Sequence, residues 1–382
     1  MLPLSPSRRA TLQALCSRIV PTCPPETDLR AAVEARLAEG DPEVARQVAA
    51  LLALFGHPAA GLLFSGRPRR FASLPPEAQD ACLRDWETSR IPLRRTVFQA
   101  FRRLVLATFY GLPESHAGIG YLGPFHERAA LHPWEGALPG APSDAEPVAR
   151  APEPALPPAP GTVTPAMRAV VVRGDALAGE TRIRADVCVV GTGAGGAVAA
   201  ARLAEAGHEV VVLEEGGFWT AEELNEREPD MVARLYADQG ARATDDLAVS
   251  IVQGRTVGGS TAVNWLIMLP TPEWVLDEWA REHGTEGMRA ADLAPVFARV
   301  EAETHTRCVP DDAHNPSNRI LLDGAARLGW SARAARINAR GCVRSGMCGL
   351  GCRYDARQGA AVAYLPRALA AGARVYADVR VD

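Results

Sequence analysis

The stretch of sequence that decides the fold runs from residue 186 to residue 214. It begins with the β-branched run Asp186-Val-Cys-Val-Val190, continues through the turn Gly191-Thr-Gly193-Ala-Gly-Gly196, and ends with Glu209-Val-Val-Val-Leu213-Glu214. An alanine-rich helical segment, capped by Gly207, joins the turn to the second run. The first run suits a fully buried parallel strand. The whole stretch predicts a right-handed βαβ unit whose first turn lies at the carboxyl edge of the sheet.

The glycine turn has the spacing of a dinucleotide-binding fingerprint. Gly191 permits a tight turn, Gly193 lets a pyrophosphate approach the backbone, and Gly196 lets helix and strand pack closely. The helix N-terminus would face the phosphates with the positive end of its dipole. Glu214 ends the second run, where it would accept a hydrogen bond from the adenosine ribose. This unit alone does not separate FAD from NAD.

A second glycine cluster follows, Gly254-Arg-Thr-Val-Gly258-Gly259-Ser260-Thr261-Ala-Val263-Asn264. Here the sequence resembles the glucose–methanol–choline (GMC) oxidoreductases, whose signature is G-R-x-hydrophobic-G-G-S-S/T-x-hydrophobic-N. The resemblance covers residues 183–382 and implies an α/β, Rossmann-like FAD-binding domain. It also implies that Gly258 and Gly259 give a flavin access to the backbone, and that Ser260 and Asn264 hydrogen-bond to it.

The same resemblance implies a function. Its members oxidise CH–OH groups of donors with FAD, as alcohol dehydrogenases or oxidases, and pass electrons to an acceptor such as oxygen, a quinone or a cytochrome. Some members attach FAD through a histidine just before the signature asparagine. Val263 stands at that position and cannot form the bond, so we expect noncovalent FAD. Two alternatives stay open: a noncatalytic flavin-binding or interaction module, and an NAD-dependent dehydrogenase, which the second glycine cluster argues against.

The end of the chain carries the last candidate residue. Gly372 to Val381 resembles the strand pair that precedes an adenine-contacting valine in the family. Val381 fits that role through its backbone, or is an ordinary strand residue. The family's catalytic histidine pair lies in a later substrate domain, and none of the eight histidines here stands in a matching context. We therefore assign no catalytic residue, and expect an FAD-binding domain incomplete at its C-terminus and inactive alone.

A third patch is rich in cysteine and glycine. Cys342, Cys348 and Cys352 follow one another at x5 and x3 spacing, and Arg357-Gln-Gly359 comes shortly after. Because the spacing lacks a pair of C-x-x-C knuckles, packed thiols are the preferred interpretation, and a zinc or iron–sulfur site is the alternative. We predict no metal site. The patch resembles a stretch in long-chain alcohol oxidases and membrane-linked sugar and alcohol dehydrogenases, where lysine usually stands in place of Arg357.

Three segments make up the expected domain organisation. Residues 1–130 carry apolar stripes at helical spacing and predict a small all-α domain, which resembles the small subunit of gluconate 2-dehydrogenase. Residues 131–166 predict an extended linker, because nine prolines lie between positions 137 and 165. Residues 167–382 form the expected GMC-type FAD-binding domain.

Composition narrows the classes of function further. The net charge is -4 and the pI about 6.1, which gives no basic field for nucleic acid. All 41 basic residues are arginine, which excludes Schiff-base and phosphate-loop lysines. No apolar run is long enough to predict a membrane span, and we expect a cytoplasmic protein. The expected partners are a small-molecule alcohol and an electron-acceptor protein or quinone.

Overall fold

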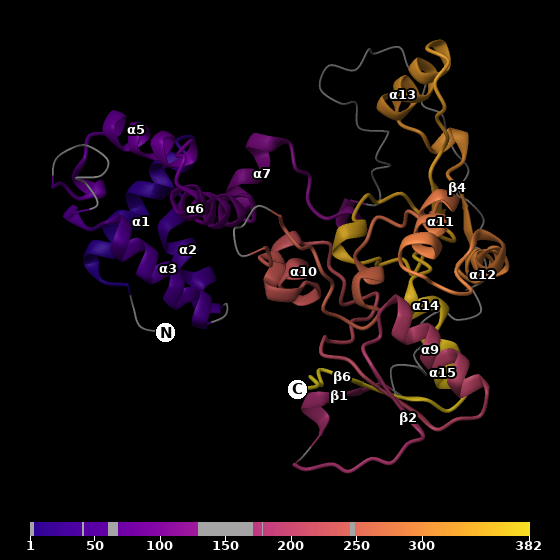
Figure 1. The fold of residues 1–382 in the computed structure, drawn as a ribbon. Coiled ribbons are helices and arrows are strands. Elements are labelled where there is room, and N and C mark those ends of the chain that lie inside the picture. The colour runs from indigo at the N-terminus through magenta and orange to yellow at the C-terminus, as the bar shows by residue number, and fades with distance from the viewer. Residues whose placement is uncertain (1–3, 40–41, 60–67, 129–170, 178, 245–248) are drawn as a thin grey trace. The chain divides into compact units, whose positions relative to one another are not determined.

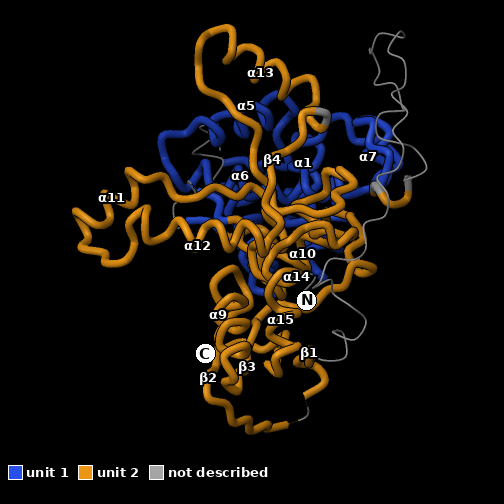
Figure 2. Tube along the Cα trace, turned by 90° about the vertical axis from the view of Figure 1, so that its right-hand side faces the viewer, with its two compact units in different colours: residues 1–123, 243–251 blue, residues 124–242, 252–382 orange. Residues whose placement is uncertain are grey.

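The structure is a computed structural model that describes residues 4–39, 42–59, 68–128, 171–177, 179–244 and 249–382 (Figure 1). The chain forms two compact units, residues 1–123 with 243–251 and residues 124–242 with 252–382 (Figure 2). The expected linker at 131–166, and both expected boundaries beside it, lie outside the described residues. No sequence pattern indicated that residues 243–251 would belong to the first unit.

The first unit is helical, as predicted. Five of its helices have proline in their first turn, where the missing N–H has no intrahelical partner to lose. The helices are α1 (Pro6–Ile19), α2 (Leu29–Glu39), α3 (Pro42–Phe55), α5 (Pro76–Glu87), α6 (Pro92–Tyr110) and α7 (Pro113–Ile119) (Figure 1).

Phe55, at the end of α3, is the centre of the core of this unit. Its ring centroid lies 4.7 Å from that of Phe71, 4.6 Å from Trp86 and 5.7 Å from Phe101. In the sequence, Val44, Val48, Leu51 and Phe55 recur at helical spacing and predict one buried face. In the structure that face is rotated by one residue at its start, because Val44 is exposed and Ala45 is buried. Periodicity thus predicted the helix and only part of its buried face.

The second unit is built on a parallel sheet in the order β1-β6-β3-β2, which confirms the α/β class. The strands are β1 (Val171–Arg173), β2 (Val187–Val190), β3 (Val210–Leu213) and β6 (Arg374–Ala377). Helices α9 (Ala194–Glu205) and α15 (Leu365–Ala370) pack together on one face. Ala200 and Ala368 meet Val212 and Val375 in that core, and their small side chains let helix and sheet approach closely.

The expectation that the first strand would be fully buried is wrong. β2 forms the edge of the sheet, and its Cys188 and Val190 are exposed. Helix α9 covers only one face of β2, the face toward which the other residues of this strand point. On the opposite face, side chains of β2, β3 and β6, with the segment that leads into β2, line a hollow of about 390 Å³.

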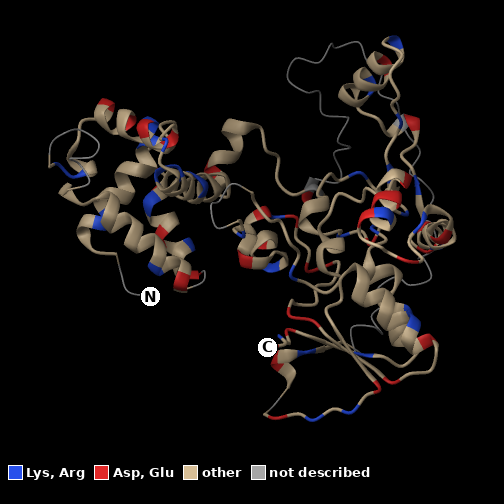
Figure 3. Ribbon diagram, in the orientation of Figure 1, with Lys and Arg blue, Asp and Glu red and all other residues tan. Residues whose placement is uncertain are grey.

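The remainder of the second unit consists of further helices and a second, two-stranded sheet. β4 and β5 form an antiparallel pair, in which Arg307 lies opposite Ile337. Basic and acidic residues are interspersed along the helices (Figure 3). No helix in the described ranges is both long and apolar enough to cross a membrane. The elements are α10 (Glu228–Leu235), α11 (Glu273–Glu282), α12 (Ala290–Glu303), β4 (Thr306–Cys308), α13 (Pro316–Arg327), β5 (Arg336–Asn338) and α14 (Ala360–Ala363).

Replacing Phe55 with alanine tests the core of the helical unit. The substitution removes a fully buried ring and leaves a cavity, so Phe55→Ala should lower the free energy of unfolding by about 3–5 kcal/mol. Leu54→Ala is the matched control, because Leu54 is its exposed neighbour on α3, and it should change stability by less than about 0.5 kcal/mol. Chemical denaturation followed by circular dichroism measures both. Equal effects would contradict this packing.

Candidate functional site

The first glycine turn is shaped by two close approaches. Gly191 has φ +90°, and its N–H donates to the carbonyl oxygen of Leu213 at 2.7 Å, which ties the turn to β3. A Cβ at Gly196 would lie 2.0 Å from the carbonyl oxygen of Gly191. Helix α9 can therefore begin directly against β2 only because residue 196 has no side chain.

The N-terminus of α9 is open. A Cβ at Gly193 or Gly195 would meet no described atom within 4 Å. Gly193 caps the helix without a side-chain hydrogen bond, and the N–H of Ala197 is the first to bond within the helix, to the carbonyl oxygen of Gly193. The amides of residues 194–196 precede the first intrahelical hydrogen bond and lie at the positive end of the helix dipole, which suits an anion such as a pyrophosphate.

Thr192 joins the turn to two other segments. Its N–H and its hydroxyl both donate to Oε2 of Glu214, at 2.8 Å and 2.6 Å. The N–H of Gly258 donates to the same hydroxyl oxygen at 2.9 Å. Oε1 of Glu214 accepts from the N–H of Gly216 at 2.9 Å. Thr192 and Glu214 are both buried, so this network holds the turn, the end of β3 and the second glycine cluster together.

The second glycine cluster lies directly on the first. Gly258 and Gly259 have φ +94° and +55°, a region that favours glycine. A Cβ at Gly259 would lie 2.8 Å from the Cα of Gly193, so the two backbones touch. The hydroxyl of Thr261 donates to the carbonyl oxygen of Gly258 and accepts from the N–H of Ala360, which secures the loop to α14.

Ser260 and Asn264 both use their oxygen atoms within the protein. Oγ of Ser260 accepts from the N–H of Gly254 at 3.0 Å. Oδ1 of Asn264 accepts from the N–H of Leu266 at 3.0 Å and from Nη1 of Arg357 at 2.7 Å. Because both partners of Oδ1 are donors, the orientation of the amide is fixed. Each side chain keeps a hydrogen-bond donor, the hydroxyl proton and the Nδ2 group, for another acceptor.

The cysteine patch is connected to this loop by Arg357. Arg357 is held opposite β5, because the N–H of the next residue, Gln358, donates to the carbonyl oxygen of Asn338 at the end of β5. Nη2 of Arg357 donates to the carbonyl oxygen of Cys348 at 2.5 Å. Burial raises the pKa of the Cys348 thiol, which Arg357 partly opposes. Within the described ranges no group of three metal-ligating side chains is present, and all eight cysteines are free thiols.

Val381 lies apart from these contacts. It is 45% exposed, and its backbone has no hydrogen bond within the described chain. The segment before it does reach the site, because the N–H of Val379 donates to the carbonyl oxygen of Glu214 at 2.9 Å. The structure therefore brings eight of the nine predicted residues into one continuous region and leaves Val381 at its margin.

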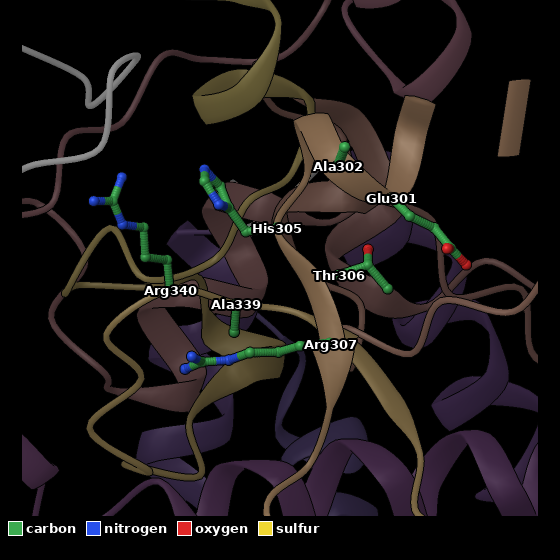
Figure 4. Close-up of a pocket in the computed structure, with 7 residues that line it drawn as sticks. All are labelled: Glu301, Ala302, His305, Thr306, Arg307, Ala339 and Arg340. Carbon is green, nitrogen blue, oxygen red and sulfur yellow. The ribbon is translucent and has the colours of Figure 1, made fainter. Parts of the chain in front are cut away.

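A second hollow, of about 350 Å³, contains none of the predicted residues (Figure 4). It lies where α12 meets β4 and β5 and is lined by His305, Arg307 and Arg340, among others. Glu301 at its edge is paired with Arg336. Its open, charged lining differs from the glycine-walled region around Gly193.

Sequence patterns did not predict the roles of Thr192 and Arg357. Thr192 occupies a variable position of the fingerprint, where any small residue satisfies the pattern. Arg357 stood in the cysteine patch, 93 residues from its partner Asn264. The sequence gives one indication of a role for Arg357. Lysine usually stands at this position in the long-chain alcohol oxidases and related dehydrogenases that the cysteine patch resembles. Only the three-dimensional structure shows what either side chain contacts.

The fold and these contacts define a nucleotide-binding α/β domain, and comparison with known proteins gives its family. A family model described as GMC oxidoreductase matches residues 232–382, and one described as an NAD(P)-binding Rossmann-like domain matches residues 189–245. The chain is 30% identical over 326 residues to a long-chain-alcohol oxidase of Arabidopsis thaliana, an alignment covering 82% of this chain and 42% of that enzyme.

A second relative supports the same assignment. An uncharacterized GMC-type oxidoreductase of Mycobacterium tuberculosis is 40% identical over 201 residues, which cover 52% of this chain and 32% of the relative. The chain thus carries the N-terminal domain of the GMC oxidoreductase family, behind a helical unit. It spans less than half the length of these curated relatives.

Replacing Thr192 with valine tests the network around Glu214. Thr192→Val removes one donor to a buried carboxylate and the acceptor of the Gly258 N–H, so the second unit should lose about 1–3 kcal/mol of stability. Thr192→Ser keeps the hydroxyl and should lose much less. Thermal unfolding of the three proteins measures the difference. If Thr192→Val were as stable as Thr192→Ser, the hydroxyl group would not contribute to the stability of this network.

Proposed function

We propose that this protein binds FAD noncovalently and serves as an oxidoreductase that acts on the CH–OH group of an alcohol. The observation that carries the proposal is the direct contact between the two glycine loops at Gly193 and Gly259. A nucleotide site needs only the first loop. The second loop carries Ser260 and Asn264, which each keep a hydrogen-bond donor, and this suits a second ligand portion with acceptor atoms, as a flavin ring has.

The residues present fit FAD along its length. The amides at the start of α9 would hold the pyrophosphate, with Gly191, Gly193 and Gly196 allowing its approach. Glu214 would accept from the ribose, and Gly258 and Gly259 would lie against the flavin. Ser260 and Asn264 would donate to the ring. We also keep Val381 as a candidate contact to adenine, because Val379 lies beside Glu214.

When bound, the flavin would supply the hydride acceptor for alcohol oxidation. The residues of this chain would bind and orient it, and we propose no catalytic base among them. Relatives named long-chain-alcohol oxidase and cholesterol oxidase support an alcohol as the substrate. An electron-acceptor protein or quinone remains the proposed partner. A noncatalytic flavin-binding module is the alternative, and it differs by lacking turnover when flavin is bound.

Replacing Gly193 with aspartate tests the cofactor site. A carboxylate at Gly193 would repel the pyrophosphate and fill the open space before α9, so Gly193→Asp should abolish the flavin absorbance of the purified protein. Gly118→Asp is the control, because a Cβ at Gly118 also meets no described atom within 4 Å, but Gly118 lies on α7. Bound flavin is measured by its visible spectrum, and NAD is titrated in parallel. Retention of flavin by Gly193→Asp, or tight binding of NAD alone, would contradict the assignment.

The mode of attachment follows from Val263. Valine has no nucleophilic atom, so acid or heat precipitation of the holoprotein should leave all the FAD in the supernatant. The measurement is the flavin absorbance of pellet and supernatant. A pellet that stays yellow after washing would reveal a covalent bond to another residue.

A further inference from the structure

Arg357 is a buried cation, and it is the one arginine among the fully buried charged residues in the described ranges. Its side chain reaches two segments at once. Nη1 donates to the carbonyl oxygen of Asn264 at 2.6 Å, to its Oδ1 at 2.7 Å and to the carbonyl oxygen of Thr261 at 3.2 Å. Nη2 donates to the carbonyl oxygen of Cys348. The guanidinium is therefore held by oxygen atoms that carry no formal charge.

The charge of Arg357 has no carboxylate to compensate it. No salt bridge joins it to an acidic residue within the described ranges. The titratable groups near it are Cys348, Cys352, Tyr236 and Cys342. Burial raises the pKa of the Cys348 thiol and of the Tyr236 phenol, so both are neutral at pH 7. An arginine stays protonated even where burial lowers its pKa, as it does here.

This charge lies next to the loop that is proposed to meet the flavin. Asn264 is a proposed ring contact, and its Oδ1 is 2.7 Å from the guanidinium. The bond fixes the amide so that Nδ2 points away from Arg357. Two-electron reduction of a flavin with uptake of one proton leaves a negative charge on the ring. A buried cation nearby stabilises that charge more than it would in water.

We propose that Arg357 is a positioning residue of the cofactor site, which holds the amide of Asn264 and whose positive charge favours the reduced, anionic form of bound flavin. The proposal rests on the proposed function, because it requires FAD at the second glycine loop. The proposal gives a role to the segment between the cysteine patch and α14, which belongs to neither glycine motif. It also predicts the direction of an electrochemical effect.

The test compares the flavin midpoint potential in four proteins. The full chain, Arg357→Met, Arg357→Lys and Arg353→Met are loaded with FAD and reduced slowly by xanthine and xanthine oxidase beside a reference dye. Arg353 is the matched control, since it lies in the same segment and donates to the carbonyl oxygens of Glu222 and Leu224. Arg357→Met should lower the affinity for reduced relative to oxidised flavin about tenfold, which is ~30 mV for two electrons. Arg353→Met should change nothing.

Each outcome decides the proposal. A folded Arg357→Met protein with bound flavin and the potential of the parent would overturn it. If Arg357→Met binds no flavin, Arg357→Lys decides. The lysine keeps the positive charge at this position, so its affinity for reduced relative to oxidised flavin should lie within about threefold of the parent. Loss of flavin from both variants would leave no effect that follows the charge and would overturn the proposal. A parent chain that binds no flavin would refute the proposed function itself.

Discussion

The second unit depends on the hydroxyl group of Thr192, which donates to the buried carboxylate of Glu214 and accepts from the amide of Gly258. Burying a carboxylate is costly unless donors surround it. Glu214 obtains two donors from Thr192 and one from Gly216. The turn after β2 and the end of β3 therefore stabilise the charge together. The second glycine loop takes its position from the same hydroxyl, although 66 residues separate Gly258 from Thr192.

This arrangement explains why the sequence predicted the elements of the site better than their connections. The roles of Gly191 and Gly196 follow from sterics within one turn, so a local pattern contains them. The contact between Gly193 and Gly259 depends on where the chain returns after α10, which no local pattern specifies. Ser260 and Asn264 were expected to offer hydrogen bonds. The structure adds that Oγ of Ser260 and Oδ1 of Asn264 already accept hydrogen bonds within the protein, while each side chain keeps a donor.

The exposure of β2 and the buried face of α3 were mispredicted for a similar reason. A run of β-branched residues predicts a strand, but its burial depends on what covers each face of the sheet. β2 is an edge strand, and this left Cys188 exposed in a stretch that reads as wholly apolar. On α3, the periodicity fixed the helix, whereas the packing around Phe55 decided that Ala45 rather than Val44 faces the core. In both cases the missing information lies in the neighbouring elements.

At position 357 an arginine and a lysine would not be equivalent, because their hydrogen-bond donors are arranged differently. A lysine has a single nitrogen, so its donors all leave from one point. The guanidinium separates its donors by a rigid plane. Here Nη1 serves the loop that holds Asn264, while Nη2 serves the turn at Cys348. One side chain thus connects two segments that no strand pairing joins directly. Because only uncharged oxygen atoms accept hydrogen bonds from this guanidinium, both segments must be in place before its burial is favourable. The cysteine patch therefore helps to position the second glycine loop through this side chain.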